Sequence, residues 1–101
     1  MSTASFNDIV AGPVPVLVDF FATWCGPCRA LAPQLEEFAQ REGSKVKVIK
    51  VDVDKNPQAA SAFQVQGVPT LILFKKGQPV WRQSGAMSSA QLSQVLAPYL
   101  V

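Results

Sequence analysis

The only two cysteines of the chain, Cys25 and Cys28, lie three residues apart in the segment TWCGPCR. Such a pair can form a structural crosslink, supply two metal ligands or act as a redox couple. A closed zinc site requires about four Cys, His or carboxylate ligands. The chain has no histidine, so a metal site here would require a second chain. A crosslink that closes a loop of about four residues contributes only roughly 2 kcal/mol. The redox couple is therefore the favoured interpretation.

The spacing of the pair suits reversible disulfide chemistry. Residues i and i+3 of a first helical turn are neighbours, so a small adjustment brings the two sulfurs to bonding distance. Cys25 is expected at the start of a helix, where unpaired N–H groups and the helix dipole stabilise a thiolate. Cys28 is expected one turn further on, less accessible, and second to react. Gly26 and Pro27 allow a tight turn into the helix, which Pro27 stiffens.

The segments around the pair predict a βαβ unit. Residues 15–22 form a nearly continuous apolar run, typical of a strand buried on both faces. Residues 26–40 carry apolar positions at helical spacing and precede a glycine stop signal. Residues 45–54 are rich in β-branched residues and predict a second strand, joined to the first by a right-handed parallel crossover.

The remaining half of the chain predicts a short helix followed by a hairpin. Asn56 is a suitable N-cap, with Pro57 at the first helical position. A strand ending near Phe74, a tight turn over residues 75–78 and a strand through Gln83 form the hairpin.

A last helix is predicted over residues 88–100. Ser88 is its expected cap, and Leu92, Val95 and Leu96 are expected on one face, with Pro98 loosening the final turn. The full order predicts an α/β protein with a central mixed four-stranded sheet flanked by helices, in a single domain over residues 1–101.

Composition excludes several classes of partner. Of 101 residues, 49% are hydrophobic and 16% are charged, with a formal net charge of +2. No apolar run reaches the length of a membrane span, and the charge is too small to indicate nucleic acid or anionic lipid as a ligand. The first residues lack a secretory signal pattern, so we expect a cytoplasmic protein. In the cytosol a close cysteine pair is more often catalytic or metal-binding than structural.

The segment VDFFATWCGPCR closely resembles the active site of the thioredoxin family, and four further features of the chain match positions of that family. These are Asp19 in VLVDF, Lys50 in VIKVD, the GVPT segment at residues 67–70, and Gly85 in SGA. The resemblance runs from Phe6 to the C-terminus. It implies a thioredoxin fold and a thiol–disulfide oxidoreductase, with Cys25 and Cys28 forming the redox-active disulfide.

The resemblance also implies roles for the matching residues. Asp19 would be a buried general base that deprotonates Cys28 through water, where the residue pattern alone also allows a strand-end aspartate facing water. Lys50 would tune that aspartate, the alternative being a solvated edge lysine. A cis bond before Pro69 would turn the Val68 backbone toward the cysteines, although an ordinary trans proline is the commoner state. The implied target-binding patch comprises Trp24, Gly26, Pro27, Val68, Pro69, Gly85 and Ala86, with Trp24 as a core aromatic the alternative.

Two features depart from the family pattern. Phe21 occupies a position where tryptophan is common, which should preserve packing. Residues 1–5 leave little room for the strand that usually precedes the first helix, so we expect the N-terminal edge strand to be missing. Residues 46–51 would then form an edge strand guarded by Lys47. The missing strand would lower stability or permit weak dimer contacts.

Taken together, the residues and the resemblance predict a protein disulfide reductase that acts on disulfide-containing target proteins. The resemblance implies recharging by a thioredoxin reductase, with no bound cofactor in this chain, no metal, no nucleic acid or membrane partner, and a monomeric state. The absence of histidine between the cysteines favours a reductant over an oxidant. A non-catalytic binding module and a disulfide oxidase or isomerase remain as alternatives.

Overall fold

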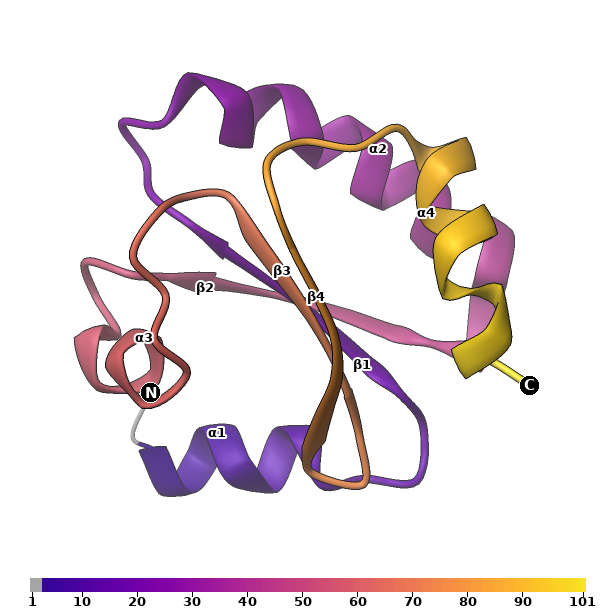
Figure 1. The fold of residues 1–101 in the computed structure, drawn as a ribbon, viewed down its shortest axis with the longest axis horizontal. Helices are drawn as coiled ribbons and strands as arrows, with labels where there is room; N and C mark the ends of the chain where they lie inside the picture. Colours follow the sequence, from indigo (N-terminus) through magenta and orange to yellow (C-terminus); the bar gives the residue numbers. More distant parts are fainter. Residues whose placement is uncertain (1–2) are drawn as a thin grey trace.

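The computed structural model describes residues 3–101. They form four α-helices and four strands, and the strands make up one sheet (Figure 1). Two short 3-10 turns, Gly43–Lys45 and Ala97–Tyr99, follow the second and last helices. The elements are α1 (Thr3–Val10), β1 (Val16–Phe21), α2 (Gly26–Glu42), β2 (Lys47–Asp52), α3 (Pro57–Ala62), β3 (Thr70–Lys75), β4 (Gln78–Ser84) and α4 (Ser89–Leu96).

The sheet is mixed and has the strand order β2-β1-β3-β4. β1 pairs in parallel with β2 and antiparallel with β3, and β3 pairs antiparallel with β4. The predicted four-stranded mixed sheet flanked by helices is therefore confirmed. β2 lies at an edge of this sheet, as expected, and its Lys47 side chain is exposed.

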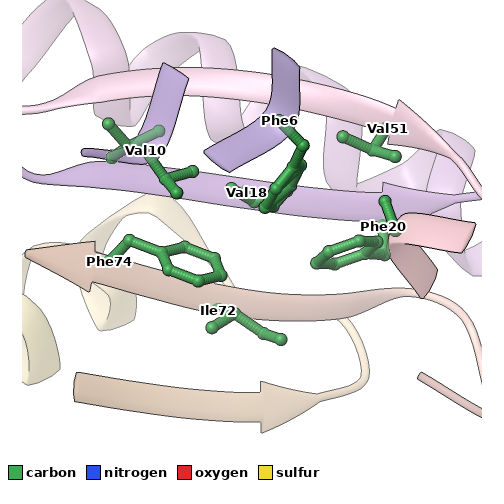
Figure 2. Close-up of a cluster of buried hydrophobic side chains, with 9 residues drawn as sticks. Phe6, Val10, Val18, Phe20, Val51, Ile72 and Phe74 are labelled. Carbon is green, nitrogen blue, oxygen red and sulfur yellow. The ribbon is translucent and has the colours of Figure 1, made fainter. Parts of the chain in front are cut away.

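Side chains of β1 alternate between two layers of helices, because successive residues of a strand point to opposite faces. Val16, Val18 and Phe20 belong to the core packed under α1 and α3 (Figure 2). Leu17 belongs to the core on the other face, beneath α2 and α4. Asp19 has the same parity as Leu17 and therefore lies on the α2 face. Figure 1 shows the two pairs of helices on opposite sides of the sheet.

The helix α1 is absent from the order predicted by residue patterns. Its residues Phe6 and Val10, four apart, are fully buried, and the Phe6 ring lies 5.3 Å from Phe63 and 5.5 Å from Phe74 between ring centroids. No strand precedes β1 within residues 3–101. Residues 1–5 were expected to be too short to hold an edge strand. Residues 1–2 lie outside the described residues, and residues 3–5 belong to α1.

The hairpin between β3 and β4 has the predicted turn. Lys76 and Gly77 are its two central residues and have φ of 51° and 83°. Positive φ at both central positions is the geometry of a type I′ turn, in which glycine avoids the steric penalty of a side chain.

Several predicted details were wrong. The second strand ends at Asp52 and not at Asp54, because the Asp52 carboxylate accepts hydrogen bonds from the N–H groups of Asp54 and Lys55 and turns the chain. Asn56 occupies the N-cap position of α3 but makes no side-chain cap bond, since its side-chain amide donates to the Asp52 carbonyl. Val95 is 39% exposed, so only its two leucine neighbours face the core.

The cap of α4 is confirmed. Ser88 accepts from the Gln91 N–H at 3.1 Å and the Gln91 side chain accepts from the Ser88 N–H at 3.0 Å, which together form a capping box. The expected loosening near Pro98 is seen as the 3-10 turn after Leu96.

The C-terminal end of α2 is bound to α4 by polar side chains. The Arg41 guanidinium donates to the Ser89 carbonyl at 3.1 Å and to the Ser93 hydroxyl at 3.0 Å. The Ser93 hydroxyl donates in turn to Glu42 at 2.9 Å. Gln34 accepts from the Ser89 N–H at 2.8 Å, so the half of α2 that runs from Gln34 to Glu42 is bound to the start of α4.

Candidate functional site

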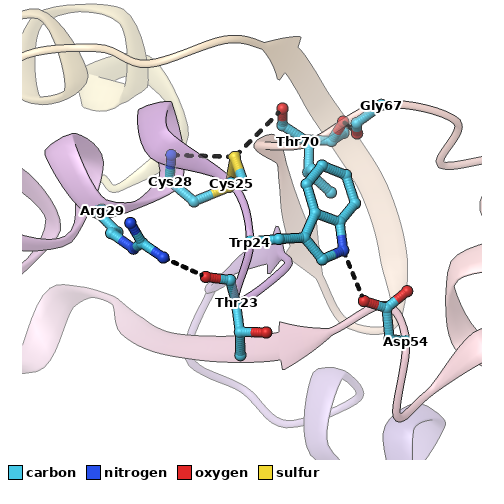
Figure 3. Close-up of a disulfide and its surroundings, with 9 residues drawn as sticks. Thr23, Trp24, Cys25, Cys28, Arg29, Asp54, Gly67 and Thr70 are labelled. Carbon is cyan, nitrogen blue, oxygen red and sulfur yellow. Dashed lines mark hydrogen bonds between the residues drawn. A yellow bond between two sulfur atoms is a disulfide. The ribbon is translucent and has the colours of Figure 1, made fainter.

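The two cysteines form a disulfide at the start of α2, with their Cα atoms 5.3 Å apart (Figure 3). Cys25 is the N-cap residue, with extended backbone angles, and Gly26 and Pro27 form the first helical positions. The Cys25 sulfur accepts from the Cys28 N–H at 3.2 Å. This is the contact in which an N-cap side chain satisfies an unpaired helical N–H, and the same N–H stabilises negative charge on that sulfur.

The expected difference in accessibility between the cysteines is wrong for the disulfide state. Cys25 is 4% exposed and Cys28 is 5% exposed, because both lie in a small cluster with Ala22, against which Val68 packs. Helix position, and not exposure, therefore distinguishes the two sulfurs. Only the Cys25 sulfur occupies the cap position.

The segment before β3 faces the disulfide. The Val68–Pro69 bond is cis, as the resemblance implied. The Val68 carbonyl oxygen lies 3.7 Å from the Cys25 sulfur. Thr70 donates from its hydroxyl to the Gly67 carbonyl at 2.6 Å, which closes the turn.

Gly85 connects the end of β4 to the same segment. Its N–H donates to the Pro69 carbonyl at 3.0 Å, and its φ of 93° lies in the region that favours glycine. The adjacent Ala86 is exposed. Gly85 is thereby joined to the segment that carries the cis bond before Pro69.

Trp24 is 68% exposed, so the alternative of a core aromatic is wrong. Its indole N–H donates to the Asp54 carboxylate at 2.9 Å, as Figure 3 shows. Sequence reasoning did not predict this contact of Asp54 with the candidate site. No local sequence pattern predicts a contact between residues that are 30 positions apart. The two aspartates at the end of the predicted second strand, Asp52 and Asp54, indicate only a turn at the end of the sheet where the site lies.

Arg29 fixes the loop from its other side. Its guanidinium donates to the Thr23 carbonyl at 2.9 Å (Figure 3). The residues on either side of the redox pair are thus connected directly. This places a permanent positive charge beside the first turn of α2.

Asp19 is fully buried, so the alternative of an aspartate facing water is wrong. Neither carboxylate oxygen has a hydrogen-bond partner among the described residues. Burial in this apolar layer raises the pKa of Asp19 from 3.8 to about 6, and the positive charge of Lys50 offsets part of that rise. The carboxyl group therefore exchanges protons close to neutral pH.

Lys50 stands directly opposite Asp19 in the parallel pairing of β1 and β2. Its side chain is exposed, and its ammonium nitrogen lies 5.0 Å from the centre of the Phe21 ring. Lys50, Phe21 and Cys28 all line a surface pocket of about 210 Å³. The predicted pair Asp19 and Lys50 thus lies on the α2 side of the sheet.

Neither a cluster of metal ligands nor a membrane-spanning helix is found among the described residues. Within residues 3–101 no group of three or more histidine, cysteine or acidic side chains is placed to hold a metal ion. No helix in the same range combines the length and apolar character needed to cross a membrane.

Comparison with known proteins identifies the family. The thioredoxin family model matches residues 1–98. A thioredoxin of Alicyclobacillus acidocaldarius is 49% identical over 100 residues, covering 99% of this chain and 95% of that protein. A thioredoxin of Mycobacterium bovis is 52% identical over 98 residues, covering 96% and 84%. A bifunctional thioredoxin reductase/thioredoxin of Mycobacterium leprae is 51% identical over 92 residues, covering 91% of this chain and 20% of that protein.

These matches cover nearly the whole chain, including the disulfide at the start of α2. The chain therefore belongs to the thioredoxin family and is a thiol–disulfide oxidoreductase whose redox couple is Cys25 and Cys28.

Proposed function

We propose that the chain works as a protein disulfide reductase, passing two electrons from its dithiol to a disulfide of a target protein. The observation that carries this proposal is the position of Cys25. Its sulfur caps α2 and accepts the Cys28 N–H at 3.2 Å. A thiolate at that position gains from both the hydrogen bond and the helix dipole, so it is available as a nucleophile near neutral pH.

The reaction proceeds by two exchanges. The Cys25 thiolate attacks one sulfur of the target disulfide, which forms a mixed disulfide and releases the other target sulfur as a thiolate. The Cys28 thiol then loses its proton and attacks the Cys25 sulfur. This forms the Cys25–Cys28 disulfide and releases the second target thiolate, so the target is reduced by two electrons and the chain is oxidised by two.

Asp19 is the proposed base for the second exchange. It lies on the face of the sheet that α2 covers, and Cys28 belongs to the first turn of α2. With a pKa raised to about 6 by burial, its carboxylate is ionised at pH 7 yet more basic than an ordinary aspartate. It would accept the Cys28 proton through water and return it to solvent after the disulfide has formed.

Target proteins would bind across the patch that surrounds the disulfide. Trp24 offers an exposed indole face, and the Val68 backbone lies next to the reacting sulfur. An extended target segment can pair with such a backbone as a short added strand. Gly26, Pro27, Pro69, Gly85 and Ala86 complete the proposed contact surface.

We also assign this chain a place in an electron-transfer chain. The dithiol would be regenerated by a thioredoxin reductase, a flavoprotein supplied with electrons by NADPH. The bifunctional relative that joins thioredoxin reductase to thioredoxin supports this pairing. The chain would act in the cytoplasm as a monomer without a bound cofactor, with the disulfide as its only redox group.

The decisive experiment is insulin reduction coupled to NADPH oxidation by a thioredoxin reductase. We expect turnover by the wild-type chain and none by Cys25→Ser. Retained turnover by Cys25→Ser would contradict the mechanism. Equilibration with glutathione mixtures separates a reductant from an oxidase or isomerase, because a reductant has the lower potential. A pure binding module would bind its partner equally well without either thiol.

A further inference from the structure

Lys50 lies between two surface pockets on the α2 side of the sheet. One pocket, of about 210 Å³, is also lined by Phe21, Cys28 and Arg29. The other, of about 190 Å³, is also lined by Glu36. The lysine side chain is exposed at an edge strand. Its four-carbon stem therefore allows the ammonium group to reach either pocket.

The charged groups around Lys50 favour different positions. The Asp19 carboxylate on β1 and the Glu36 carboxylate on α2 both attract the ammonium group, while the Arg29 guanidinium on α2 repels it. Within residues 3–101 Lys50 takes part in no ion pair. Its ammonium nitrogen instead lies 5.0 Å from the centre of the Phe21 ring. That distance falls within the range of about 6 Å for a cation–π contact.

We propose that Phe21 is a positioning residue for the redox reaction, because its ring holds the Lys50 ammonium group at the pocket lined by Cys28 and away from Glu36. The ring lies on the α2 face of β1, two residues after Asp19 and on the same side of the strand. A cation held there is near the buried carboxylate without forming an ion pair with it. The ring thereby sets how strongly Lys50 stabilises the ionised form of Asp19.

This positioning has a consequence for the second exchange, which rests on the proposed role of Asp19 as the base. Without the ring, Lys50 moves toward Glu36 or into water, and its positive charge then stabilises the ionised Asp19 carboxylate less. The pKa of Asp19 then rises further, and the carboxylate is less available at neutral pH. The second exchange would consequently be slower at neutral pH.

The test is an NMR titration of the Asp19 side-chain carboxyl carbon in the oxidised chain, where the cysteines do not titrate. We expect Phe21→Leu to raise the midpoint by on the order of half a pH unit, as for a unit charge moved a few ångströms away at an effective dielectric constant near 20. Phe21→Trp should keep the wild-type midpoint, because indole binds cations at least as well as phenyl. In a Lys50→Met background, Phe21→Leu should produce no further change.

Phe63→Leu is the matched control, because Phe63 is a partly buried phenylalanine on the opposite face of the sheet. It should lower stability without moving the Asp19 midpoint. The proposal is overturned if Phe21→Leu leaves the midpoint unchanged, if both leucine variants move it equally, or if the Phe21→Leu effect persists without Lys50.

Activity measurements separate this proposal from the proposed mechanism. If Phe21→Leu moves the Asp19 titration and the pH profile of insulin reduction together, both are supported. If the titration moves and the profile does not, Phe21 still positions Lys50, and the assignment of Asp19 as the base fails.

Discussion

Replacing Asp19 by asparagine should stabilise the folded chain at neutral pH. Asparagine resembles the protonated carboxyl group in shape and cannot ionise, so it avoids placing a buried, unpaired charge in the core. The pKa of Asp19 rises on folding from 3.8 to about 6 because of burial. Since one pKa unit corresponds to about 1.36 kcal/mol, the charged form costs about 3 kcal/mol above pH 6.

The pH dependence has a definite sign. A raised pKa means that the folded state holds its proton more tightly than the unfolded state. The resulting stability is therefore fully present below pH 3.8 and is lost as the pH rises to about 6. The difference between Asp19→Asn and wild type should be about 3 kcal/mol at pH 8 and should fall to about 0.5 kcal/mol at pH 4.

Urea unfolding of the oxidised wild type and Asp19→Asn, at intervals from pH 4 to pH 8, measures this difference. The slopes with urea should agree, so that the change appears in the midpoints. Insulin reduction by Asp19→Asn should fall at the same time. If the two proteins keep a constant stability difference across this range, Asp19 does not carry a raised pKa and the reasoning about its burial is refuted.

Three further changes test other parts of the site and fold. Cys28→Ser should trap targets on Cys25 as mixed disulfides, visible by mass spectrometry and reversed by dithiothreitol; recovery of free target alone would contradict the order of attack. Asp54→Ala should move the indole N–H resonance of Trp24 and weaken target binding by about fivefold, the effect of losing a hydrogen bond worth about 1 kcal/mol, and unchanged binding would remove the bond from the recognition argument. Ser88→Ala should lower the free energy of unfolding by about 1 kcal/mol through loss of the helix cap while the redox potential stays the same; an unchanged unfolding midpoint would show that the capping box adds no stability.

The parts of the fold that residue patterns predicted are those with strong local signals. β1 is buried at five of its six positions, which makes its apolar run unambiguous. The hairpin has a glycine at one of the two turn positions with positive φ. By contrast, α1 places Phe6 and Val10 in the core among residues 5–10, and the Phe6 ring packs against Phe63, which follows α3, and against Phe74 of β3. Such tertiary support leaves little trace in a short sequence window.

The candidate site likewise has parts that local sequence signals predict and parts that depend on tertiary structure. The spacing of the cysteines and the start of α2 between them follow from local rules, so the redox pair was predictable. The hydrogen bond from Trp24 to Asp54 was not, because it joins two loops that only the completed sheet brings together. The predicted cap at Asn56 was not formed, since its side-chain amide donates a hydrogen bond to the Asp52 carbonyl and makes no cap bond to α3.

The polar contacts between α2 and α4 have a mechanical consequence for the redox cycle. Arg41, Glu42 and Gln34 hold the distal turns of α2, and Pro33 contributes no N–H to the helix just ahead of them. Pro33 therefore lies between the redox pair and the part of α2 that is bound to α4. We therefore expect any displacement that accompanies opening of the disulfide to be larger in the first turns of α2 than in the part bound to α4.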